Sequence, residues 1–203
     1  MPAPSEIVDA LESVVDIFLS NIRHRERAAF ILCDNLVEMA CKTKAKQNNR
    51  NFNLRCNFHD AWNAPGVNLP SNGLGGRVQN RRETRNLMQH ANAAVTVDTQ
   101  ACADAILDAV KVIDRLWRNT SRRAFRDWLK VAIRIVRLYS QSGDPQMRQR
   151  FEMRMRNESW RDFKRPARVR EMIIEPGLRQ HWGIVVKHNP SQVEQILNEL
   201  QIP

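Results

Sequence analysis

Apolar residues recur every three or four positions along most of this chain, which is the spacing that gathers them on one face of an α-helix. Residues 5–22 show it first, with Ser5 as a candidate N-cap. Further helices are expected at residues 26–46, at residues 76–95, and from a cap at Asp98 or Thr99 to about residue 117. Four amphipathic helices without strand-like alternation predict an all-α protein that begins with an up-and-down four-helix bundle.

The second half of the chain continues the helical pattern. A fifth helix is expected from Ser121 to about Tyr139, and "SGDP" then ends it and provides Asp144 as the cap of a sixth helix at residues 145–160. "SQVE" at residues 191–194 resembles a capping box that opens a last helix. A short hairpin is possible within residues 169–186. We therefore expect two domains, a bundle at residues 1–120 and a smaller, mostly helical module at residues 121–203.

The net charge of +10 is unevenly distributed. Residues 1–120 hold 15 Lys and Arg against 13 Asp and Glu, whereas residues 121–203 hold 17 against 9. A basic half favours a polyanionic partner, most often a nucleic acid. Within it, one cation per helical turn predicts an RNA-contacting stripe, which consists of Arg126, Lys130, Arg134 and Arg137.

Other classes of protein are less consistent with the sequence. The four cysteines form no CxxC pair, and no cluster of His, Asp or Glu suggests a metal site, so we expect buried free thiols, no metal and no cofactor. No apolar run reaches the length of a membrane span, and the N-terminus does not resemble a secretory signal. The expected location is cytoplasmic, without membrane contact.

The segment "RRETRNLMQHANAAV", residues 81–95, combines possible chemistry with a helical pattern. Because each helical residue turns by about 100°, its polar side chains share one half of the helix: Arg82, Arg85, Asn86, Gln89 and His90. The opposite half is apolar and is expected to pack into the bundle: Leu87, Met88, Ala91 and Val95. Asn86 lies one turn before His90, close enough to orient its ring.

These residue types suit phosphodiester chemistry. An imidazole can give or take a proton near neutral pH, and a guanidinium can hold non-bridging phosphate oxygens and stabilise charge that develops in the transition state. Without a metal site, the reaction that fits is cleavage of RNA, in which the 2′-hydroxyl attacks its own phosphate. A polar helix face with an incidental His remains the alternative.

"RNLMQH" resembles the R-x4-H motif of the HEPN superfamily of helical-bundle ribonucleases and nucleotide-binding domains, including its variant with Asn directly after Arg. The surroundings are similar too: two long amphipathic helices precede the motif, and the capped segment "DTQACADAILDAVKVIDRLW" follows it. The resemblance covers roughly residues 5–118. Some members have a Tyr two residues after the motif His, where this chain has Asn92.

The resemblance implies a metal-independent endoribonuclease of a prokaryotic defence or toxin type, which acts as a homodimer with a composite active site. Arg85 and His90 would then be catalytic, with Asn86 as orienter or substrate contact and Arg82 as an RNA contact. Glu38, or with less support Asp34, would supply an acidic residue near the site. An antitoxin or another regulatory protein would be a possible partner.

Two other functions are consistent with the sequence. One is a binding module of the same fold that holds RNA or a nucleotide without cleaving it. The other is a helical adaptor whose basic half docks another protein or DNA.

Overall fold

A computed structural model describes residues 2–20, 22–69, 72–90, 95–158, 160 and 182–203. In these ranges helices are the only regular secondary structure, which confirms the all-α prediction. The first half contains α1 (Ser5–Phe18), α2 (Arg25–Asn48), α3 (Phe58–Trp62), α4 (Leu74–His90) and α5 (Thr99–Leu116). The second half contains α6 (Thr120–Arg123), α7 (Asp127–Tyr139), α8 (Pro145–Asn157), α10 (Trp182–His188) and α11 (Pro190–Glu199).

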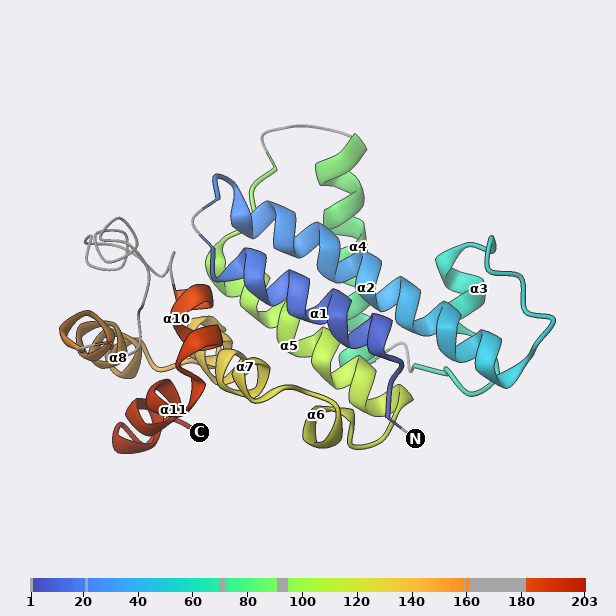
Figure 1. Ribbon diagram of the computed structural model, residues 1–203. Coiled ribbons are helices and arrows are strands. Elements are labelled where there is room, and N and C mark those ends of the chain that lie inside the picture. The colour runs from blue at the N-terminus through green and yellow to red at the C-terminus, as the bar shows by residue number, and fades with distance from the viewer. Residues whose placement is uncertain (1, 21, 70–71, 91–94, 159, 161–181) are drawn as a thin grey trace.

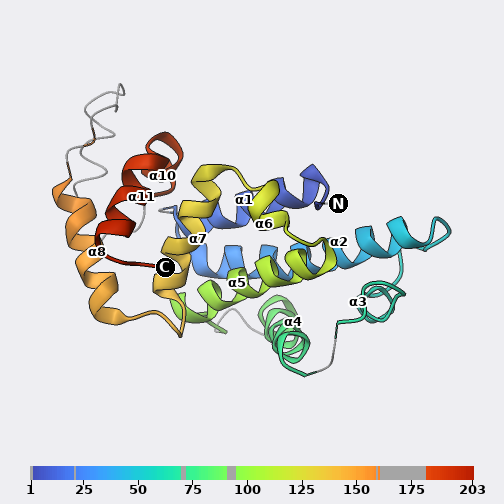
Figure 2. The ribbon, with the colours of Figure 1, turned by 90° about the horizontal axis from the view of Figure 1, so that it is seen from below.

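Three long helices form the body of the molecule. α1, α2 and α5 lie side by side, and α7 packs against α5 and α1 (Figure 1). Their apolar stripes meet in one core, whose fully buried side chains include Leu11, Phe18, Leu36, Ile106 and Leu129. α4 differs from its neighbours because it crosses α2 and α5 instead of running along them (Figure 2).

The inner face of α4 is not the face that its apolar residues predicted. Val78 and Met88 are buried, but Leu87 lies on the outer face of α4 and is 55% exposed. The prediction that Leu87 packs into the bundle is therefore wrong. Arginines lie between Val78 and Met88 on the inner face, where buried carboxylates of α2 and α5 attract them. Ala91, predicted as core, and Asn92 lie outside the described residues.

Helix ends follow the predicted caps at two positions. Asp98 accepts a hydrogen bond from the backbone N–H of Ala101 at 2.7 Å, and Asp144 accepts one from Gln146 at 2.8 Å. Two other cap predictions are wrong: Ser5 already lies inside α1 after Pro4, and α11 begins at Pro190, so Ser191 is not its cap. Pro190 is the first residue of α11, where its fixed φ suits a first turn that needs no N–H from that residue. Pro4, in contrast, directly precedes α1 as its N-cap.

Two segments of the second half also differ from expectation. The helix expected from Ser121 to Tyr139 is divided into α6 and α7 by a break at residues 124–126. The hairpin proposed within residues 169–186 is wrong for its described part, which is helix α10; residues 169–181 lie outside the described residues.

Contacts cross the predicted domain boundary at residues 120/121. Nε of Arg126 donates to Glu12 of α1 at 2.7 Å, and a series of aromatic contacts links Phe18 of α1 to Tyr139, Trp182 and Phe151. The apolar core contains residues from both sides of the boundary. None of the described helices combines the length and the apolar character that a membrane crossing requires.

Candidate functional site on helix α4

Two buried carboxylates hold α4 against the body of the molecule. The first is Asp108 of α5, whose side chain is only 4% exposed. Arg77 donates to both of its oxygens, at 2.8 and 3.1 Å, and Arg81 donates to Oδ2 at 2.6 Å. Burial alone would raise the pKa of Asp108, but the bonds and charges of Arg77 and Arg81 outweigh burial and lower it.

The second carboxylate is Asp34 of α2. One of its oxygens lies 3.2 Å from Nη1 of Arg82 and 3.0 Å from Nε of Arg85. Here burial dominates and raises the pKa of the carboxyl, and the two arginines only oppose that effect. The Nε–H of Arg85 is not aligned with the oxygen for a hydrogen bond, which leaves this attraction mainly electrostatic.

Glu38, one helical turn after Asp34, joins the same network through Arg82. Its carboxylate is 2.9 Å from Arg82 and 2.8 Å from Lys42. Burial opposes ionisation of Glu38, but hydrogen bonds from Lys42 and Arg82 lower its pKa. The guanidinium of Arg82 also lies over the ring of Phe58 in α3, 4.2 Å from the centroid. Glu38 therefore contacts Arg82, whereas Asp34 is the acid that contacts Arg85.

The structure brings Arg85 and Asn86 together. Nη1 of Arg85 donates to Oδ1 of Asn86 at 3.0 Å, and Nη2 donates to Oδ1 of Asn35 at 2.8 Å. With Asp34 on its remaining side, the guanidinium is held from three directions and its side chain is 14% exposed. Its orientation is set by α2 as well as by its own helix.

His90 lies apart from this cluster. It is the last residue of α4 and its side chain is exposed. Within the part of the chain that the structure describes, no hydrogen bond or ion pair joins it to Arg85 or Asn86. Arg27 of α2 fastens this end of α4, because it donates to the carbonyl oxygens of Met88 at 2.5 Å and Val95 at 3.2 Å. The end of the helix is thus anchored while the imidazole faces solvent.

The stripe predicted to contact RNA is not a row of free cations. Arg126 pairs with Glu12 of α1, with Nε 2.7 Å from the carboxylate, and Lys130 pairs with Asp127 at 2.9 Å. Arg134 bonds to Asn198 at 2.9 Å and to the carbonyl of Ile202. Arg137 is exposed and lacks such a partner among the described residues.

Sequence reasoning missed Asp108, Asn35 and Arg27, and it placed Asp34 second to Glu38. A signal was present for the two aspartates, since each lies within an apolar helical stripe. Asp34 lies between Phe30 and Val37, and Asp108 lies next to Ala109. A carboxylate at such a position is expected to require a cation from a neighbouring helix.

The cysteines contribute no reactive group here. All four are free thiols, and Cys33, Cys41 and Cys102 are buried as expected, whereas Cys56 is only partly buried. Burial raises the pKa of Cys41 to about 12, so this thiol stays protonated at neutral pH. Among the described residues, no group of three or more His, Cys, Asp or Glu is arranged to hold a metal ion.

Comparison with known proteins adds no family to this picture: neither a protein-family model, nor a curated protein, nor a solved structure matches the chain.

Proposed function

We propose that this protein is a metal-independent endoribonuclease with an HEPN-like active site on α4. The observation that carries the proposal is the arrangement of the R-x4-H segment: Arg85 is positioned by Asp34, Asn35 and Asn86, and an exposed His90 ends the same helix. The segment thus provides a fixed guanidinium and a solvent-accessible imidazole, two groups that metal-independent phosphodiester cleavage can use.

Each residue has a role in this mechanism. Arg85 contacts a non-bridging phosphate oxygen and stabilises the charge that develops on it. His90 takes the proton from the 2′-hydroxyl or gives one to the leaving oxygen, and Asn86 contacts the substrate. Asp34 positions Arg85, while Glu38 acts one step further away, through Arg82.

The proposed active site is shared by two subunits. Arg85 and His90 are not in contact within one chain, and Leu87 lies exposed between them in sequence on the outer side of α4. If the α4 helices of two copies face each other, the His90 of one copy can reach the phosphate held by Arg85 of the other. A regulatory partner protein that covers α4 would silence such an enzyme.

A non-catalytic module that binds RNA or a nucleotide is the second candidate. One observation favours it: both Arg82 and Arg85 turn inward to Asp34, so much of their hydrogen-bonding capacity is already used within the chain. In that case the arginines mainly attach α4 to α2, and His90 plays no chemical role.

The deciding experiment incubates the full chain with labelled single-stranded RNA in excess EDTA. We expect fragments that end in a 2′,3′-cyclic phosphate. His90→Ala is expected to reduce cleavage at least about 100-fold, since general acid–base catalysis contributes that much or more, while Gln89→Ala, the exposed neighbouring position, retains activity.

Arg85→Ala removes a partner of a buried carboxylate and can weaken the fold, so Arg85→Lys is tested beside it. The lysine keeps the positive charge but loses the planar fork of N–H donors, and we expect a folded protein with strongly reduced cleavage. Intact RNA that all variants bind equally well would contradict catalysis and support the binding module.

A further inference from the structure

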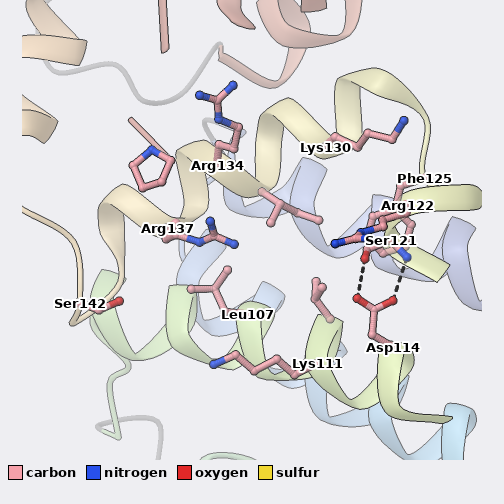
Figure 3. A pocket seen from close by; sticks show the side chains of 13 residues that line it. Leu107, Lys111, Asp114, Ser121, Arg122, Phe125, Lys130, Arg134, Arg137 and Ser142 are labelled. Atoms are coloured by element: carbon pink, nitrogen blue, oxygen red, sulfur yellow. Dashed lines mark hydrogen bonds between the residues drawn. The ribbon is translucent and has the colours of Figure 1, made fainter. Parts of the chain in front are cut away.

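A cavity separate from the α4 site lies where α5, α6 and α7 meet (Figure 3). Its volume is about 740 Å³, within the range of pockets that hold small organic ligands. None of the residues assigned to the α4 site lines it. It therefore requires its own explanation.

The floor of the cavity is apolar. Leu107 and Val110 of α5 contribute to it together with Phe125 and Ile133. Leu107 and Val110 are only partly buried, so their side chains offer open apolar surface to a ligand. Burial of such surface favours an occupant with an apolar body.

The walls are strongly basic. Five cations line the cavity: Lys111, Arg122, Lys130, Arg134 and Arg137. Among the side chains that line the cavity there is a single carboxylate, that of Asp114, and it is already occupied because it accepts both the N–H and the hydroxyl of Ser121, at 2.8 and 2.5 Å. The charge of this cavity is thus positive and uncompensated from within, which favours an anion.

The five cations are not equivalent. Lys111 lies 3.5 Å from Asp108, Lys130 pairs with Asp127, and Arg134 reaches Asn198 of α11. Arg122 and Arg137, in contrast, have no hydrogen-bond or ion-pair partner among the described residues, and their guanidinium groups point towards each other from opposite sides of the cavity (Figure 3). Two like charges directed into one space indicate that an anion belongs between them.

The pKa of Arg134 is consistent with a positively charged cavity. Burial lowers the pKa of its guanidinium; Glu194 opposes the change and the charge of Arg137 adds to it. The positive charge of Arg137 is therefore felt by its neighbour on the same helix.

From this arrangement we propose that the cavity binds a small organic phosphate, with the phosphate between Arg122 and Arg137 and the apolar part of the ligand against Leu107 and Val110. Each guanidinium presents a fork of N–H donors, and a phosphate offers oxygens in several directions, so it can accept from two opposed forks at once. A carboxylate has only two oxygens in one plane and satisfies this pair less well. The proposal does not depend on ribonuclease activity at α4.

Calorimetric titration of the full chain at low salt tests the site with three probes: adenosine diphosphate, geranyl diphosphate and inorganic phosphate. The two diphosphates share an anionic group and differ in the attached body, so their relative affinities distinguish a nucleotide from a hydrocarbon phosphate. We expect at least one of them to bind at least about tenfold more tightly than inorganic phosphate, because it adds a second phosphoryl group for the guanidinium groups and a body that contacts the apolar floor.

Three substitutions locate the binding. Arg122→Gln and Arg137→Gln are each expected to weaken binding of the preferred diphosphate by about tenfold or more, as loss of a charge-assisted hydrogen bond predicts. Arg123→Gln is the matched control, because Arg123 is an exposed neighbour on α6 that does not line the cavity. Val110→Phe fills the floor without changing any charge and is expected to block binding.

The proposal is overturned if neither diphosphate binds at millimolar concentration, or if inorganic phosphate binds as tightly as both. It is equally overturned if Arg122→Gln, Arg137→Gln and Arg123→Gln weaken binding to the same small extent, which would indicate diffuse attraction to a basic surface. Thermal unfolding of each variant in the absence of ligand confirms that the fold is retained.

Discussion

At the scale of single residues, Asp34 and Asp108 show how the number of partners decides the state of a buried carboxylate. Asp108 accepts three hydrogen bonds from Arg77 and Arg81, and its pKa is lowered. For Asp34, the effect of burial exceeds the opposing effect of Arg82 and Arg85, and its pKa is raised. The two anchors of α4 thus respond to pH in opposite directions.

Asp108→Asn is predicted to destabilise the folded protein by about 2 kcal/mol at pH 7, because it leaves Arg77 and Arg81 without their common anion; Arg77 is half exposed, which reduces the loss below that of a fully buried pair. The folded state lowers the pKa of Asp108, so its stabilisation is present above the unfolded value of about 3.9 and is lost as the pH falls through the folded value.

Urea unfolding of the wild type and Asp108→Asn at pH 7 and near pH 3 measures this effect. We expect the difference in free energy of unfolding to shrink at the lower pH, because that pH lies below the pKa of the carboxyl in the unfolded chain and folding must then release a proton from Asp108. An equal difference at both pH values would contradict an electrostatic role for Asp108.

At the scale of secondary-structure elements, α4 and α5 are stabilised in different ways. α5 buries a continuous apolar stripe and has a side-chain cap at Asp98. α4 buries few apolar side chains and relies on arginine–carboxylate pairs with its two neighbours. This attachment places polar groups on the inner face of α4, and it leaves the apolar Leu87 available on the outer face.

The cap of α5 is predicted to matter because this helix lies at the centre of the core. Asp98→Ala removes the oxygen that accepts from Ala101 and is expected to cost about 1 kcal/mol of stability. Asp98→Asn keeps an accepting oxygen without the charge and should lose much less. Gln100→Ala, at an exposed site in the same turn, is the control for helix propensity. Chemical denaturation measures all three; equal losses for Ala and Asn would show that charge, and not the cap bond, is responsible.

At the scale of the whole molecule, α7 links the two predicted domains. It packs on α5 and α1, and it also contacts α10 and α11. Arg126 and Lys187 add ion pairs to acidic residues of α1. The described second half is therefore attached to the first by a shared core and by charge.

A core substitution in α7 is predicted to affect the stability of the first half as well. Leu129 is fully buried, and Leu129→Ala is expected to lower the free energy of unfolding by about 2–5 kcal/mol. Circular dichroism and tryptophan fluorescence should follow one transition, shifted to the same extent. Leu54→Ala, at a half-exposed site outside the helices, should change stability by less than about 0.5 kcal/mol. Separate transitions, with only one shifted, would instead support independent domains at the 120/121 boundary.

The helices themselves follow from local information. Periodic apolar positions predicted α1, α2, α5 and most of α7, because burial of a stripe such as that of Cys102, Ile106 and Ile113 requires only a helix and a neighbour. The caps at Asp98 and Asp144 depend on bonds to residues two or three positions away, so they too could be predicted. The residue types of the candidate site, Arg85, Asn86 and His90, are likewise a property of one short segment.

The tertiary structure alone decided which way these side chains face. In sequence, Leu87 belongs to the apolar half of α4 and Arg85 to the polar half, yet Leu87 is exposed and Arg85 is held against α2. The reason is that buried carboxylates on two other helices determine the orientation of α4, and their distance in sequence hides them from any local pattern. The cavity between Arg122 and Arg137 has the same origin, because it exists only where α5, α6 and α7 meet. Local spacing determines which helices form, whereas long-range pairing of charges determines what their faces present.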